Sequence, residues 1–175
     1  MRKKSLYHCT VDSTGRILQV ARRKLQHRAY NEPVVPRLCA CPSVAECFAA
    51  RLFPPYKPVY VYRTMKQVKG ITPTGVWDAA ITRERWLIPP MRLERFAEIP
   101  WDIVDAAQVA VRLYHQATRK KSSWELRLMQ LLEATEVLGA YRADFVDRRR
   151  LALVKRFCTQ HGLPTEHASR YILGI

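Results

Sequence analysis

Apolar and polar positions follow two different patterns along this chain, and the change falls near Pro100. Before Pro100, short apolar runs alternate with turn residues and frequent prolines, which is typical of strands and short helices. After Pro100, apolar residues recur every three or four positions, as they do on the buried face of a helix. The pattern therefore predicts an α+β fold, with an antiparallel sheet in residues 1–99 and a helical bundle in residues 100–175.

Several stretches of the first part have the alternation and residue types of β-strands. They are residues 5–10, 37–41, 59–63 and 84–89, with residues 92–99 as the expected antiparallel partner of the last. The segment 15–28 is basic and fits either a loop or a short helix. Ser43 follows Pro42 and is a favourable N-cap, so a helix is expected to begin there and to end before Pro54.

Helical periodicity in the second part predicts three helices and a short fourth one. They cover residues 101–115, 124–138, 145–161 and 166–173. Gly162 followed by Pro164 is a typical helix stop and places the end of the third helix. Two lobes that meet near Pro100 are one expectation. A single unit is the other, because Trp101 and Trp124 need burial somewhere.

The chain is strongly basic, and this predicts an anionic partner. Its 175 residues include 30 Lys and Arg against 15 Asp and Glu, which gives a formal net charge of +15. Such an excess most often indicates nucleic acid. The residues expected to contact it are Arg22, Arg23, Lys24, Arg148, Arg149 and Arg150. A solvated helix face beside Asp144 and Asp147 is the other explanation of the second group.

Apolar segments that target or anchor proteins are not found in the sequence. No apolar run approaches the roughly 18 residues of a bilayer span, and the basic N-terminus precedes no apolar signal core. We therefore expect a cytoplasmic protein without a membrane partner. The five cysteines are odd in number and lack the spacing of a zinc motif, so we expect free thiols and no metal site.

Three polar residues stand at the edges of predicted elements in the first part. His8 lies near the end of the first strand, Ser43 opens the first helix, and Glu84 begins the strand after the long loop. A His, a Ser and a Glu in this order can line a pocket for a dinucleotide in a split sheet.

With these residues in LYHCT (6–10), PRLCACPSVAECF (36–48) and RERWLI (83–88), the chain resembles the ADP-ribosyltransferase superfamily. The resemblance covers residues 6–99 and extends to small phage-encoded members. It implies an ADP-ribosyltransferase-like split antiparallel sheet, with the helical bundle outside the matched part. It also implies that NAD is bound as a substrate and that ADP-ribose is transferred to an acceptor.

By this resemblance, His8 would hold the adenine-side ribose, and the backbone of Cys9 would hold the nicotinamide amide. Ser43 would shape the pocket, and Tyr30 or Phe48 would stack against the nicotinamide ring. Each side chain also has an ordinary structural alternative. A strand-end His is often structural, Ser43 can be only an N-cap, and Phe48 can be a core residue.

By the same resemblance, Glu84 would be the catalytic carboxylate, with His8 beside it. Cleavage of the nicotinamide–ribose bond creates an oxocarbenium-like cation, which a carboxylate stabilises strongly in a site that excludes water. The structural alternative for Glu84, which stands between Arg83 and Arg85, is a solvated strand face with a cross-strand ion pair. Two positions depart from the family: Thr82 replaces an acceptor-positioning Glu or Gln, and Cys9 replaces a glycine.

Three functions follow, in this order. The first is an NAD-dependent ADP-ribosyltransferase, phage- or toxin-related, that modifies a nucleic acid or a protein bound to one. The second is an inactive binding protein of the same fold, a phage-type inhibitor or regulator of a host protein or nucleic acid. The third is transfer of an RNA 2′-phosphate to NAD, with Arg16, Arg37 and Arg83 as phosphate ligands.

Overall fold

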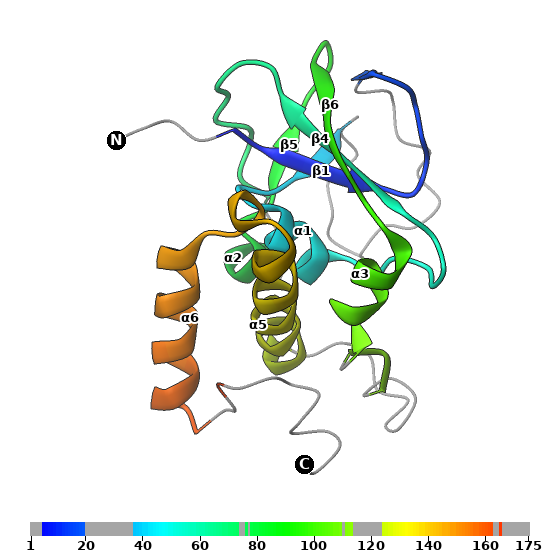
Figure 1. The fold of residues 1–175 in the computed structure, drawn as a ribbon. Helices are drawn as coiled ribbons and strands as arrows, with labels where there is room; N and C mark the ends of the chain where they lie inside the picture. Colours follow the sequence, from blue (N-terminus) through cyan, green and yellow to red (C-terminus); the bar gives the residue numbers. More distant parts are fainter. Residues whose placement is uncertain are drawn as a thin grey trace.

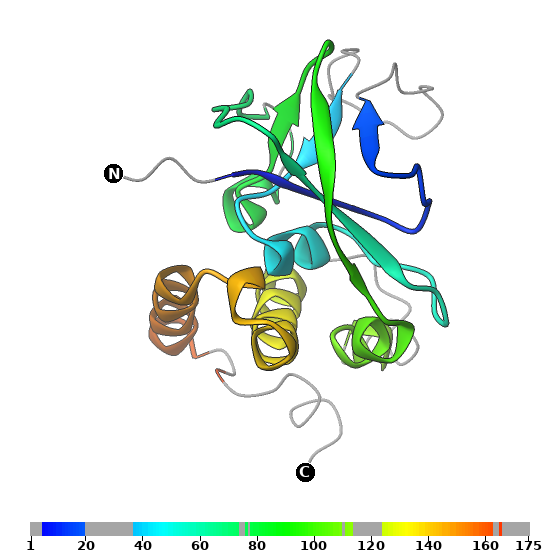
Figure 2. The same cartoon turned by 45° about the horizontal axis from the view of Figure 1, so that its top comes forward.

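The computed structural model describes residues 5–19, 37–73, 76, 78–109, 111–113, 124–162 and 165. Its fold class is α+β, as the sequence pattern predicts. A curled antiparallel sheet lies against a group of helices on one side (Figures 1 and 2). Within the described part of the chain, no helix combines the length and the apolar character needed to cross a membrane.

The strands form a four-stranded sheet and a two-stranded ribbon. The sheet has the antiparallel order β1 (Tyr7–Thr10), β4 (Val59–Thr64), β6 (Arg92–Ile99), β2 (Ile17–Gln19). The ribbon pairs β3 (Leu38–Ala40) with β5 (Arg85–Leu87). Two backbone hydrogen bonds of 2.8 Å between Tyr7 and Cys41 join the ribbon to the β1 edge of the sheet.

The predicted pairing of residues 84–89 with 92–99 is wrong. β6 pairs with β4 and β2, whereas β5 pairs with β3. Along β4 and β6, Val59 lies opposite Ile99 and Val61 opposite Ala97. These apolar cross-strand pairs fix the register, and they outweigh the closeness of β5 and β6 in the sequence.

The basic segment 15–28 also differs from its prediction, which was a loop or a short helix. Its residues Ile17–Gln19 form β2, with Leu18 opposite the buried Leu93 of β6. Leu18 is partly buried against the apolar cluster that contains Leu93. This packing explains why a strand forms in a basic stretch. The segment from residue 20 to residue 36 lies outside the described residues.

The first helix begins where the sequence predicts. α1 (Val44–Ala50) has Ser43 as its N-cap, and the Ser43 side chain accepts a hydrogen bond from the Glu46 backbone N–H. The helix lies between the sheet and α5, and α6 and α3 flank α5 (Figure 1). Other helical elements are α2 (Ala79–Thr82), α3 (Trp101–Ala106), α5 (Trp124–Tyr141), the 3-10 turn η1 (Ala143–Phe145) and α6 (Arg148–Gln160).

The helix predicted at 101–115 begins as expected; α3 ends at Ala106, a turn follows at Ala107 and Gln108, and the backbone is helical again at residues 109 and 111–113. α5 continues through Gly139 to Tyr141, beyond the predicted end. α6 begins at Arg148, because Asp147 rather than an earlier residue caps its first turn. The predicted helix at 166–173 lies outside the described residues.

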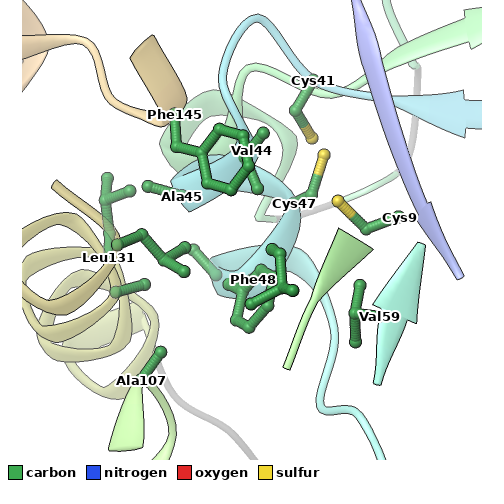
Figure 3. Close-up of a cluster of buried hydrophobic side chains, with 14 of the residues drawn as sticks. Cys9, Cys41, Val44, Ala45, Cys47, Phe48, Val59, Ala107, Leu131 and Phe145 are labelled. Carbon is green, nitrogen blue, oxygen red and sulfur yellow. The ribbon is translucent and has the colours of Figure 1, made fainter. Parts of the chain in front are cut away.

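The main hydrophobic core is shared by residues from both sides of Pro100. Phe48 and Val59 belong to the same buried cluster as Leu131, Phe145 and Val154 (Figure 3). The core is thus continuous across the change in pattern, and the division into 1–99 and 100–175 stays a prediction. Tryptophan burial does not hold the two parts together, since Trp101 and Trp124 are 50% and 40% exposed.

Candidate functional site

His8 lies where the sheet meets the ribbon. It is half-buried in β1, and its Nδ1 is 2.8 Å from the carbonyl oxygen of Cys39 in β3. A carbonyl oxygen can only accept, so Nδ1 donates, and in the neutral ring Nε2 is then the unprotonated nitrogen. The hydrogen bond therefore sets both the orientation and the tautomer of the ring.

Glu84 directly precedes β5 instead of lying within the strand, and it is half-buried. Its Oε1 accepts a hydrogen bond from Nε1 of Trp86 at 3.0 Å. Trp86 is the cross-strand partner of Cys39, whose carbonyl holds His8. His8 and Glu84 are thus both hydrogen-bonded to the same cross-strand pair of the ribbon.

Trp86 is held from a second direction by Arg37. The indole is 3% exposed and Arg37 is 5% exposed, and the guanidinium carbon lies 3.9 Å from the ring centroid. A desolvated cation–π contact of this kind contributes about 2 kcal/mol. Trp86 was missed in the sequence, although its spacing of two from Glu84 on an expected strand places both on one face.

Ser43 belongs to a separate group of polar side chains around Glu46. The Ser43 hydroxyl donates to Oε2 of Glu46 at 2.9 Å. Glu46 is 1% exposed, and Arg83 contacts both of its oxygens, with Nε at 2.5 Å from Oε1 and Nη2 at 3.1 Å from Oε2. Ser43 is therefore connected to Glu84 only indirectly, through Glu46 and the neighbouring Arg83.

Two residues from the start of α6 complete this group. Nη2 of Arg83 donates to Oδ2 of Asp147 at 3.0 Å, and Nε of Arg150 lies 3.9 Å from Oε1 of Glu46. Nη2 of Arg150 also donates to two carbonyl oxygens of α2, at 3.1 and 3.0 Å. We call Glu46, Arg83, Asp147 and Arg150 the Glu46 cluster; it balances two carboxylates against two guanidinium groups.

Burial and the charges of oppositely charged neighbours act in opposite directions within the Glu46 cluster. Burial raises the pKa of Glu46 above the ordinary value of 4.5, although the hydrogen bonds from Arg83 and Ser43 and the charges of Arg83 and Arg150 act the other way. Burial and the charge of Arg83 lower the pKa of Arg150. For Arg83, burial is outweighed by Glu46 and Asp147, and the pKa is raised.

The sequence contains a local signal for the role of Glu46. Ser43 and Glu46 have the S-x-x-E spacing of a capping box, in which the glutamate turns back toward the N-cap. Here the carboxylate accepts from the Ser43 hydroxyl and from Arg83. The spacing does not indicate that Arg83 and the start of α6 also contact Glu46.

Three thiols fill the core beside His8. The sulfur atoms of Cys9, Cys41 and Cys47 gather at one end of the hydrophobic cluster (Figure 3). Burial, followed by the hydrogen bond to Cys47, raises the pKa of Cys9. The hydrogen bond to Cys47 and then burial raise the pKa of Cys41. Cys9 and Cys41 are therefore neutral thiols at pH 7, and the Cys9 side chain is part of the core.

All five cysteines are free thiols. Among the described residues, no three His, Cys, Asp or Glu side chains are arranged to hold a metal ion.

Phe48, expected to stack on nicotinamide, and Thr82, which departs from the family at its acceptor-positioning residue, are both fully buried. Phe48 is 0% exposed and packs against Phe53 with ring centroids 4.8 Å apart, so it cannot stack on nicotinamide. Thr82 is also 0% exposed, and its hydroxyl donates to the carbonyl of Asp78. Tyr30, the other candidate for stacking, lies outside the described residues.

The residues predicted to contact nucleic acid differ in their exposure and in their contacts. Arg148 and Arg149 are exposed in the first turn of α6, and neither forms an ion pair with another described residue. Arg150 belongs to the Glu46 cluster and donates to carbonyl oxygens of α2, and its contact with nucleic acid stays a prediction. Arg22, Arg23 and Lys24 lie outside the described residues.

The arginines assigned to a transferred phosphate do not converge either. Arg37 lies over Trp86, Arg83 is bound to Glu46, and Arg16 is exposed next to β2.

Comparison of the chain with protein-family models, with curated proteins and with solved structures found no match.

Proposed function

We propose that the protein is an NAD-dependent ADP-ribosyltransferase that modifies a nucleic acid or a protein bound to one. One observation carries this proposal: His8 and Glu84 hydrogen-bond to the same cross-strand pair, Cys39 and Trp86. These are the two residues to which the sequence resemblance gives the ribose-binding and catalytic roles. Both are half-buried, where a carboxylate acts more strongly than in bulk water.

In the proposed reaction, nicotinamide leaves with the electron pair of its bond to ribose. The ribose carbon becomes cationic, and the Glu84 carboxylate stabilises that charge while holding a ribose hydroxyl. Trp86 fixes Oε1 of Glu84, so Oε2 is the oxygen expected to contact ribose. A nucleophile of the acceptor then attacks the same carbon and loses its proton.

His8 would bind the second ribose. Its Nδ1 is used by the Cys39 carbonyl, so the contact with the ribose hydroxyl is expected at Nε2. Fixing both riboses aligns the reacting bond with the acceptor, and such alignment contributes several kcal/mol to catalysis, on the order of 7–11 in well-oriented systems.

The positive charge supports an anionic acceptor. The net charge is +15, and Arg148 and Arg149 of α6 are exposed. Arginines that neutralise phosphates release bound counterions, so binding should weaken as salt is raised.

The test is release of nicotinamide from NAD by the purified protein, alone and with RNA, duplex DNA or cell lysate. Glu84→Gln is expected to lower the rate by about 100-fold or more, because a neutral amide cannot stabilise the developing cation. Glu98→Gln is the matched control, since Glu98 is exposed on β6 and contacts Arg95 at the surface. Equal rates for Glu84→Gln and the wild type would overturn the assignment.

A second candidate is a binding protein that retains the fold without catalysis. Thr82 favours it, because this position would contact the acceptor in several branches of the family and here is fully buried. On this alternative, no additive gives nicotinamide release, while single-stranded RNA or duplex DNA binds with a salt-dependent affinity. Release that depends on Glu84 excludes it.

A further inference from the structure

Arg83 has an unusual backbone for its residue type. Its φ is +51° and its ψ is 31°, in the left-handed region, at the point where the chain leaves α2 and approaches β5. Glycine, asparagine and aspartate adopt this region readily, whereas an arginine there is unfavourable. Interactions of the Arg83 side chain must offset that cost.

Those interactions are given by the Glu46 cluster. The Arg83 guanidinium contacts both oxygens of Glu46, which is 1% exposed, and one oxygen of Asp147. A charged, two-point contact to a buried carboxylate is among the strongest hydrogen-bonded pairs in proteins. The side chain thus holds the backbone of residue 83 in a conformation that its residue type disfavours.

The backbone of Arg83 determines the direction in which Glu84 leaves the turn. Glu84 is the next residue, and its carboxylate must meet Nε1 of Trp86, two residues further on. A change in φ or ψ at Arg83 would displace Glu84 before it displaces any residue of β5, which is paired with β3.

Helix α6 holds this turn at two points. Asp147 caps α6 through Oδ1, which accepts from the Arg150 backbone N–H at 3.3 Å, and it binds Arg83 through Oδ2. The Arg150 side chain donates to two carbonyl oxygens of α2, just before the turn. The last carbonyl oxygens of a helix have no partner within the helix and need such donors. The start of α6 therefore stabilises the end of α2 as well as Arg83.

We propose that Arg83 is a positioning residue for Glu84, and that Asp147 of α6 holds Arg83 in place for this purpose. The proposal rests on the proposed function for its catalytic meaning. It gives the helical part of the chain a direct role in the site, although the sequence resemblance ends at residue 99.

The experiment compares Arg83→Lys, Arg83→Ala and Asp147→Asn with the wild type, because alanine lacks the guanidinium and still disfavours the left-handed region. Asparagine is as good an N-cap as aspartate, so Asp147→Asn keeps the cap of α6 and removes only the charge that faces Arg83. Asp144→Asn is the matched control, because Asp144 is exposed and pairs with Arg142 at the surface.

The first readout does not need NAD. The indole N–H of Trp86, assigned with Trp86→Phe, gives an NMR signal that reports its hydrogen bond to Glu84. We expect Arg83→Ala and Asp147→Asn to shift this signal and to speed its hydrogen exchange by about tenfold or more, with Arg83→Lys intermediate. An unchanged signal in folded Arg83→Ala and in Asp147→Asn would overturn the proposal.

The second readout is the rate of nicotinamide release. A displaced carboxylate should lower kcat by about tenfold to 100-fold with little change in KM, and the conservative Arg83→Lys should recover part of the loss. If the wild type releases no nicotinamide, the proposed function fails, while the Trp86 signal still decides whether Arg83 positions Glu84. A normal kcat in Asp147→Asn and Arg83→Ala contradicts the proposal.

Discussion

At the scale of single residues, Glu46 shows how one side chain connects distant parts of the sequence. It is almost fully buried in α1, and it contacts Ser43 of the same helix start, Arg83 of the turn before β5 and Arg150 of α6. Removing a charge from water is costly, and two guanidinium groups offset that cost only in part. The part of the desolvation cost that is not offset appears as the raised pKa of Glu46.

This raised pKa predicts how stability depends on pH. The folded protein binds a proton at Glu46 more readily than the unfolded chain, whose pKa is near 4.5. The stability that Glu46 contributes is therefore fully present below the pKa of the unfolded chain. It is lost as pH rises through the higher pKa of the folded protein. Relative to Glu46→Gln, which does not titrate, the wild type should gain stability as pH falls across this window.

Urea unfolding of both proteins at a series of pH values measures this difference. Glu98→Gln, at an exposed position, controls for the loss of a carboxylate in general. If the wild type instead loses stability relative to Glu46→Gln as pH falls through the window, the folded pKa of Glu46 is lowered, and the account of the Glu46 cluster is wrong.

Residue types alone gave part of the candidate site. His8 and Glu84 could be identified because each stands at the edge of an expected strand in a recognisable motif. Trp86 and Glu46 had local signals that were missed, namely the spacing of two from Glu84 and the capping box with Ser43. The contacts of Arg83 with Glu46 and Asp147 could not be predicted, because they join segments far apart in the chain. The Arg83–Asp147 bond, for example, spans 64 positions.

At the scale of elements, the start of α1 and the turn before β5 govern the site. The start of α1 was predicted because an N-cap is a local signal, and Ser43 occupies it. The partner of β5 was not, because strand pairing depends on which apolar faces meet across the sheet. The strand β2 was missed for the same reason. It forms by pairing with β6, and residues 17–19 alone do not indicate that partner.

Ser43→Ala tests the element that carries Glu46. The variant loses both the N-cap and the hydroxyl that donates to Glu46, so it should lower the free energy of unfolding by about 1–2 kcal/mol. Ser13→Ala in the exposed β1–β2 loop is the matched control. Urea denaturation measures both, and equal midpoints for Ser43→Ala and Ser13→Ala would contradict the assigned role of Ser43.

At the scale of the whole molecule, the continuous core joins the sheet to the helices. Phe145 of η1 is 0% exposed and shares its cluster with Phe48 of α1 and Val59 of β4. The change in sequence pattern at Pro100 marks a change from strands to helices, and the core extends across it. The site depends on this packing, since α6 reaches Arg83 only when the helices lie against α1.

Phe145→Ala should therefore destabilise both parts together. Removing a buried phenylalanine costs about 3–5 kcal/mol, and the loss should appear equally in β4 and in α5. Native-state hydrogen exchange measures the two elements separately. If the amides of α5 lose protection while those of β4 keep it, the two parts fold as independent domains, and the shared core does not couple them.

The most direct test of the central claim is the rate of nicotinamide release from NAD by the wild type, His8→Ala, Glu84→Gln and the double variant. Residues that act on one transition state have non-additive effects, so the double variant should be about as slow as Glu84→Gln alone. That result, with a large loss in each single variant, is what the account predicts. Release that is unaffected by either substitution, or absent from the wild type with RNA, DNA and lysate, would contradict it.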